Sequence, residues 1–136
     1  MDIKDLAKKY NLEKTDFWEM KFGGRSNWII THDACEKIAH IEGIKFHKPE
    51  VFRDGNANVA MLGTASKGDK HVWTTGEASP IYNKMAYNWA MCEKRLKDRL
   101  TLQMINAYEY GIYSDVEADD FKRKPHNVSA KDMGYE

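Results

Sequence analysis

Two spacings in this sequence could support chemistry on phosphate groups. The first is GTASKGDK at residues 63–70, which approximates the phosphate-loop pattern G-x-x-x-x-G-K-[ST]. Asp69 interrupts that pattern before Lys70, and His71 stands where a hydroxyl side chain would hold magnesium. A phosphate loop should also open a helix, whereas VWTT follows here. We therefore predict a β-hairpin tip at 67–70 and no nucleotide cofactor.

The second spacing is a pair of carboxylates, Asp54 and Glu77, near the ends of predicted strands. A metal-dependent nuclease needs several carboxylates that converge on its ions. The Asp…Glu-x-Lys pattern of many such enzymes is absent, because Ser79 stands two residues after Glu77. Five of the other acids lie close together in 109–120, as is typical of a solvated surface. A nuclease is therefore the alternative hypothesis, and a non-catalytic protein is the main one.

The cysteines indicate neither a disulfide framework nor a metal site. Cys35 and Cys92 are far apart in the chain, so both are expected to be small core residues. His32 and Cys35 have a spacing seen in zinc sites, but no second ligand pair of similar spacing accompanies them. No metal cofactor is expected.

Positive charge is concentrated locally although the net charge is zero, from 21 basic and 21 acidic residues. A predicted long helix carries a basic face, which a solvated surface with pairs such as Glu93 with Lys97 would explain. The same face could hold phosphates while aromatic rings stack bases, with Trp28 and Trp73 as candidate rings. Both interpretations stay open. The bases on this helix are Lys84, Lys94, Arg95, Lys97 and Arg99, and those on the predicted strands are Lys45, Lys48, Arg53, Lys67 and Lys70.

Helical periodicity first appears at the N-terminal end of the chain. Residues 2–10 place Ile3, Leu6 and Tyr10 on one side of a short helix. The glycines of 22–27 indicate a turn or loop.

A second helix is predicted over 32–42. Asp33 and Glu36 are spaced as in a capping box, and Gly43 suits a left-handed C-terminal cap.

Beyond this helix the apolar period changes to two, which predicts three consecutive strands at about 44–49, 59–65 and 71–77. Short turns join them, so an antiparallel meander is expected, with two open edges. Ser79 and Pro80 then precede a long helix. Its apolar stripe consists of Met85, Trp89, Cys92, Leu96, Leu100 and Met104.

These elements predict an α+β fold: a helix, a three-stranded antiparallel β-meander and a long helix packed on the sheet. We divide the chain into an N-terminal helix and loop (1–27), a β-β-β-α core (28–110) and an acidic segment with a disordered tail (111–136). No apolar run is long enough for a membrane helix, and the N-terminus lacks the pattern of a signal peptide. A cytoplasmic protein without a membrane partner is expected.

The segment GEASPIYNKMAYNWAMCEKRLKDRLTLQMI resembles the glycine-to-helix segment of the Rad-fifty-two-like single-strand annealing superfamily, which includes phage recombination proteins. In that family a glycine-containing turn leads into a long helix with a Glu-Lys…Asp pattern, and Glu93, Lys94 and Asp98 stand in those places here. The order helix, β-β-β, helix also matches, over 28–110. The chain is similar as well to phage proteins that contain THDACEKIA and WTTGEASP.

The resemblance implies a non-catalytic, cofactor-free protein that binds single-stranded DNA and anneals strands in phage-type homologous recombination. It implies a homo-oligomeric ring or helical filament, with a host or phage replication protein as a further candidate partner. Carried over by position, the DNA-binding residues are Lys94, Arg95, Lys97 and Arg99 on the helix and Lys67 and Lys70 on the hairpin; Lys45 and Arg53 complete the expected groove.

The chain departs from that family at Thr101 and Gln103, which stand where relatives often have bases. A third hypothesis is a protein that binds another protein through an open sheet edge or through the acidic segment.

Overall fold

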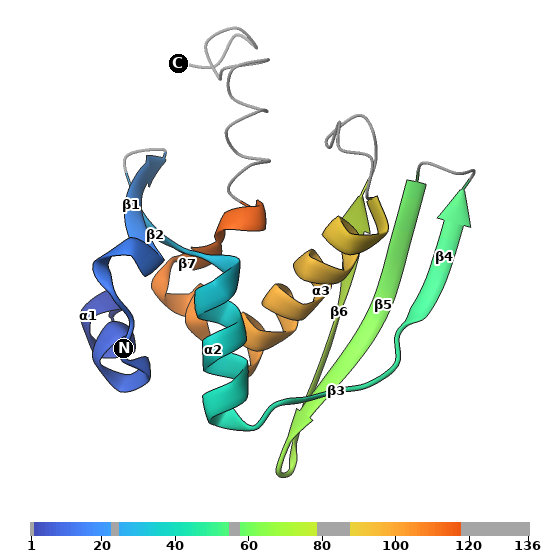
Figure 1. Cartoon of the computed structure of the whole chain (residues 1–136), viewed down its shortest axis with the longest axis horizontal. Helices are drawn as coiled ribbons and strands as arrows, with labels where there is room; N and C mark the ends of the chain where they lie inside the picture. Colours follow the sequence, from blue (N-terminus) through green and yellow to red (C-terminus); the bar gives the residue numbers. More distant parts are fainter. Residues whose placement is uncertain (1, 23–24, 55–57, 79–87, 118–136) are drawn as a thin grey trace, which may run out of the picture.

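The computed structural model describes residues 2–22, 25–54, 58–78 and 88–117, and it has the predicted α+β class (Figure 1). None of the helices it describes is long and apolar enough to cross a membrane. The elements in chain order are α1 (Ile3–Tyr10), a 3-10 turn η1 (Lys14–Asp16), β1 (Phe17–Phe22), β2 (Arg25–Ile30), α2 (His32–Glu42), β3 (Lys45–Phe46), β4 (Glu50–Asp54), β5 (Asn58–Lys67), β6 (Lys70–Ala78), α3 (Asn88–Met104), a 3-10 turn η2 (Ala107–Tyr110) and β7 (Ile112–Ser114).

A three-stranded sheet that the sequence analysis did not predict, here sheet A, has the order β1-β2-β7. Strands β1 and β2 form an antiparallel hairpin in which Phe17 lies opposite Ile30, so the predicted loop at 22–27 belongs largely to strands. Strand β7 pairs parallel to β2. Sheet A thus takes strands from all three predicted segments of the chain, and the boundary drawn at 27/28 falls inside β2.

A four-stranded antiparallel sheet, here sheet B, is organised around β5. Strand β6 pairs with one side of β5, while β3 and β4 pair with the other side. The strand expected at 44–49 is therefore replaced by β3 and β4, with Pro49 between them, as the missing N–H of proline favours. The predicted hairpin tip is confirmed, because Lys67 pairs with Lys70 and Gly68 has a φ of +58°.

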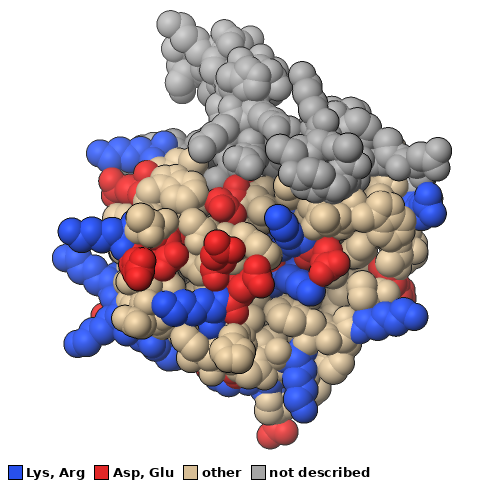
Figure 2. Space-filling view, in the orientation of Figure 1, with Lys and Arg blue, Asp and Glu red and all other residues tan. Residues whose placement is uncertain are grey.

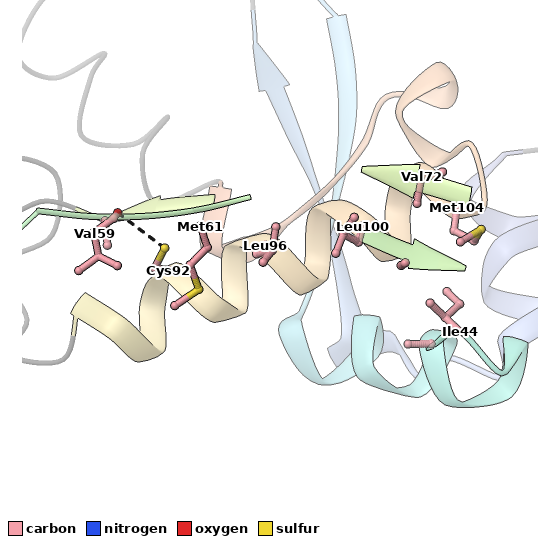
Figure 3. Packing of buried hydrophobic residues seen from close by; sticks show 11 residues of the cluster. Ile44, Val59, Met61, Val72, Cys92, Leu96, Leu100 and Met104 are labelled. Atoms are coloured by element: carbon pink, nitrogen blue, oxygen red, sulfur yellow. Dashed lines mark hydrogen bonds between the residues drawn. The ribbon is translucent and has the colours of Figure 1, made fainter. Parts of the chain in front are cut away.

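Helix α3 lies between two hydrophobic clusters. Its stripe of Cys92, Leu96, Leu100 and Met104 packs on sheet B (Figure 3). On another side of the helix, Leu102 joins the cluster formed by α1, α2 and sheet A. Figure 1 shows α3 crossing the middle of the molecule between these two parts. Of the other two members of the predicted stripe, Trp89 is exposed, and Met85 lies outside the described residues.

The close packing of α3 on β6 depends on Gly76. A Cβ atom at this position would lie 2.7 Å from the carbonyl oxygen of Cys92 and 2.9 Å from the backbone nitrogen of Leu96. Only glycine therefore lets the backbone of the helix approach the strand this closely. Cys92 itself is a buried free thiol, as is Cys35, which confirms the prediction that both cysteines are core residues.

The ends of α2 follow from local signals. The helix spans His32–Glu42 as predicted, and Gly43 caps it in the left-handed region with a φ of +65°. The predicted N-terminal cap is wrong by two residues. Thr31 is the N-cap, and its hydroxyl oxygen accepts from the backbone N–H of Ala34 at 3.0 Å, whereas Asp33 lies in the first turn. The predicted first helix is confirmed as α1, with Ile3, Leu6 and Tyr10 buried.

Candidate nucleic-acid interface

The two arginines predicted to bind DNA from the long helix bind sheet B instead. Arg95 is only 3% exposed, and its Nη1 donates to the carbonyl oxygen of Glu77 at 2.6 Å. Nη1 of Arg99 donates to the carbonyl oxygen of Thr75 at 2.7 Å. Because β6 is an edge strand, these two bonds cap backbone carbonyls that would otherwise be available to another strand.

Arg99 also holds the carboxylate that was considered for a nuclease. Its Nη1 and Nη2 each donate to one carboxylate oxygen of Glu77 at 2.9 Å, and its Nε donates to Glu117 at 2.8 Å. The side chain of Asp54 lies outside the described residues. In the part of the chain that the structure describes, no group of three or more His, Cys, Asp and Glu residues could hold a metal ion.

The two hairpin lysines attach the tip of β5 and β6 to helix ends. Lys67 forms an ion pair with Glu42 at the end of α2, which also accepts from the hydroxyl of Tyr10. These two partners lower the pKa of Glu42 to about 2. Nζ of Lys70 donates to the carbonyl oxygen of Met104 at 2.7 Å, at the C-terminus of α3, where the helix dipole favours a cation.

The remaining predicted cations lie in three places. Lys94 and Lys97 line a pocket between α2 and α3. The guanidinium of Arg53 lies 5.2 Å from the centre of the Trp89 ring. Lys45 lies on the face of sheet B that α3 does not cover. Lys84 lies outside the described residues. The structure therefore does not bring the nominated cations together in one groove. Figure 2 likewise shows acidic and basic side chains side by side over this view, without a continuous basic band.

The face of sheet B that α3 does not cover, here the open face, carries exposed aromatic side chains. Odd-numbered residues of β5, such as Val59 and Met61, point into the core, so even-numbered residues point to the open face. By register, Trp73 lies opposite Thr64 and Phe52 lies opposite Ala60 on this face. Their side chains are 66% and 55% exposed, respectively. Exposed large apolar side chains on one sheet face are typical of a binding surface.

One end of the open face is basic. Ser66 pairs with Lys45 on one side and with His71 on the other, which puts both bases in one row across the sheet. The ring of His47 lies beside this row, with its Nε2 at 3.1 Å from the hydroxyl of Ser66. Trp73 stands two residues from His71 and hence one step further along the same face.

The two tryptophans nominated as stacking platforms differ in their surroundings. Trp73 is exposed on the open face. Trp28 instead packs against the cluster of α1, α2 and sheet A, with its ring edge-on to Phe17 at a centroid distance of 5.9 Å. Only Trp73 is available to stack on a ligand. Phe52 was missed in the sequence analysis, because no strand was predicted over Glu50–Asp54, where β4 lies.

The pocket between α2 and α3 contains a histidine–aspartate pair that the sequence analysis also missed. Nδ1 of His32 lies 2.7 Å from Oδ1 of Asp98, and its Nε2 lies 2.9 Å from a carboxylate oxygen of Glu36. The backbone N–H of His32 donates to Asp115 at 3.1 Å. No local sequence pattern predicts this pair, because His32 and Asp98 are 66 residues apart in the chain.

Burial and pairing shift the proton affinity of both groups. Burial raises the pKa of Asp98 to about 6, since the carboxylate is only 1% exposed. The hydrogen bond to Asp98 raises the pKa of His32. Burial also raises the pKa of the Cys35 thiol, which lines the same pocket, so this pocket offers no reactive thiolate there.

Comparison with known proteins adds no assignment: no protein-family model, no curated protein and no solved structure matches this chain.

Proposed function

We propose that this protein binds single-stranded DNA without catalysis and promotes strand annealing, and that the open face of sheet B is its binding surface. The observation that carries the proposal is the pair of exposed rings, Trp73 and Phe52, on a sheet face that α3 leaves uncovered. The sequence resemblance to single-strand annealing proteins supports the same function. In this proposal the open face takes the place of the predicted groove between the hairpin and the long helix. The arginines and hairpin lysines of that groove form hydrogen bonds and ion pairs with other parts of the chain.

The spacing of the two rings suits an extended strand. Thr64 and Ala60, which lie opposite them on β5, are four residues apart, so the rings are separated by roughly 13 Å along the strands. Two strand spacings add about 10 Å across the sheet. Bases that are not neighbours in sequence could therefore stack on the two rings, with Leu62 between them on the same face.

The basic row supplies charge for the phosphates at one end of this surface. Lys45 and His71 flank Ser66, and Trp73 stands next in line. A surface with exposed rings and few cations favours single strands, because their bases are free to stack. It does not favour duplex DNA, which is bound mainly through charge. A base held by its ring face keeps its pairing edge accessible, which is what annealing requires.

Self-assembly into a ring or filament is part of the proposal. Strand β4 is an edge of sheet B, and its Val51 side chain is 42% exposed. The opposite edge, β6, is capped by Arg95 and Arg99. Among the described residues no side chain caps β4 in this way, and an open edge beside an exposed apolar side chain is the more favourable place for a second subunit.

Fluorescence anisotropy with a labelled oligothymidylate tests the proposal. A Trp73→Ala, Phe52→Ala double variant should bind at least tenfold more weakly, because each stacked base contributes about 1–3 kcal/mol. Tyr110→Ala is the matched control, since it removes a 45% exposed aromatic ring from η2, outside sheet B. Equal binding by the parent and the double variant would exclude the open face.

Three further measurements complete the test. Electron microscopy with and without the oligonucleotide examines assembly, with rings or filaments expected. Incubation of labelled strands with Mg²⁺ or Mn²⁺ should leave them intact, whereas fragments would favour the nuclease. A monomer that binds no oligonucleotide would indicate that the open face binds a protein instead.

A further inference from the structure

The pocket between α2 and α3 has a volume of about 470 Å³, within the range of small-molecule sites. Phe46 of β3 brings it against the side of sheet B that α3 covers, so it is distinct from the open face. Its apolar part includes Ala39, Ile44 and Phe46, and its polar part includes His32 and Lys94. A surface of this kind suits a ligand with a small apolar body and one polar group.

The pairing of the charged side chains indicates the sign of that polar group. The three carboxylates that line the pocket are each already bound to a lining base: Glu36 and Asp98 to His32, and Glu93 to Lys97. Two lining bases, Lys94 and His40, make no hydrogen bond or ion pair with any residue that the structure describes. Lys94 is therefore the charged lining group that is left without a partner among the described residues, and an anionic group on a ligand would supply one.

His32 offers a second anchor. Its Nδ1 is held by Asp98, which is buried and fixes the orientation of the ring. Its Nε2 is directed to Glu36, whose side chain is 65% exposed. An ion pair with so exposed a carboxylate contributes little, so another anion can replace Glu36 at this nitrogen at small cost.

We infer that this pocket binds a small organic anion, whose carboxylate or phosphate group is held by Lys94 and His32 while its apolar body lies on Ala39, Ile44 and Phe46. Glu36 occupies the anion position at His32 when no ligand is bound. The inference is independent of the proposed function, since it uses no residue of the open face.

Isothermal titration calorimetry with benzoate, phenyl phosphate and inorganic phosphate tests the inference. At least one of the two aromatic probes should bind tenfold more tightly than inorganic phosphate, because only these probes carry an apolar body. Comparing the affinities of benzoate and phenyl phosphate shows whether the pocket prefers a carboxylate or a phosphate group. Equal, weak binding of all three would overturn the inference, since it would reflect non-specific attraction to charge.

Substitutions at two exposed residues, Lys94 and Glu36, test where the ligand binds. Lys94→Gln should weaken binding of the preferred probe at least fivefold, whereas Lys94→Arg should retain most of it. Glu36→Gln should tighten binding about threefold or more, because it removes the competing carboxylate. Unchanged affinity in both Lys94→Gln and Glu36→Gln would overturn the assignment, and urea unfolding of each variant shows that the comparison is made on folded protein.

Discussion

The guanidinium of Arg99 holds both carboxylate oxygens of Glu77, each at 2.9 Å, and so joins helix α3 to the edge strand β6. The same guanidinium reaches Glu117 at 2.8 Å, just beyond strand β7 of sheet A. One side chain thus connects sheet B with the segment that follows β7. The arginine contributes to the fold, and all three nitrogens of its guanidinium are bound to partners within the chain.

Replacing this arginine should therefore destabilise the protein. We expect Arg99→Ala to lower the free energy of unfolding by about 2 kcal/mol, because it leaves Glu77 and Glu117 without their shared cation in a partly buried site. Urea unfolding measures the change. Lys48→Ala, which removes an exposed cation, is the control and should change the stability by less than about 0.5 kcal/mol. If both variants unfold like the parent, the ion pairs contribute nothing to stability.

The contact between α3 and β6 predicts an intolerant glycine. Gly76→Ala should cost roughly 2–3 kcal/mol, because its Cβ would meet backbone atoms of Cys92 and Leu96 that cannot move independently. Gly63→Ala is a matched control: the nearest atoms to its Cβ would be side-chain atoms of Leu96, which can adjust more readily than a backbone can. Thermal unfolding should rank Gly76→Ala clearly below Gly63→Ala, and the reverse order would contradict the packing.

The pair of His32 and Asp98 predicts a dependence of stability on pH. Both pKa values are raised in the folded protein, so the native state holds more protons than the unfolded state from about pH 4 to above the pKa of His32. Their contribution to stability is therefore present at low pH and is lost as the pH rises through this range.

Asp98→Asn removes one of the two titrating groups and, with it, the carboxylate that raises the pKa of the other. Its free energy of unfolding should vary less between pH 5.5 and 8.5 than that of the parent, by on the order of 1 kcal/mol. Urea unfolding at the two pH values measures the difference, and NMR titration should show the pKa of His32 returning toward its ordinary value. Parallel pH profiles for the two proteins would show that the pair does not control this dependence.

The basic row of the open face predicts a change in the salt dependence of DNA binding. Lys45→Ala should reduce the slope of log K against log salt by about 1, because one phosphate contact is lost. Lys8→Ala removes an exposed lysine from α1 and should leave the slope unchanged. Anisotropy titrations at several salt concentrations make the comparison, and identical slopes for the parent and Lys45→Ala would remove Lys45 from the interface.

Local signals in the sequence were sufficient for several elements. The limits of α2, the left-handed cap at Gly43 and the hairpin tip at 67–70 could be predicted, because each depends on residues that are neighbours in the chain. The β1–β2 hairpin had a comparable signal, two apolar strands around Gly23 and Gly24, which was interpreted only as a loop. That error came from the interpretation, since the information was present.

The environment of α3 could be decided only by the tertiary structure. One apolar stripe predicted a helix whose basic face was open to solvent or to DNA. Instead α3 lies between two clusters, so Arg95 and Asp98 are buried on sides that the pattern left open. The partners of these side chains are Glu77 on β6 and His32 on α2, far away in sequence. The apolar periodicity of a helix predicts which of its faces is apolar and which is polar. How many layers pack around the helix depends on contacts between segments that are distant in the sequence.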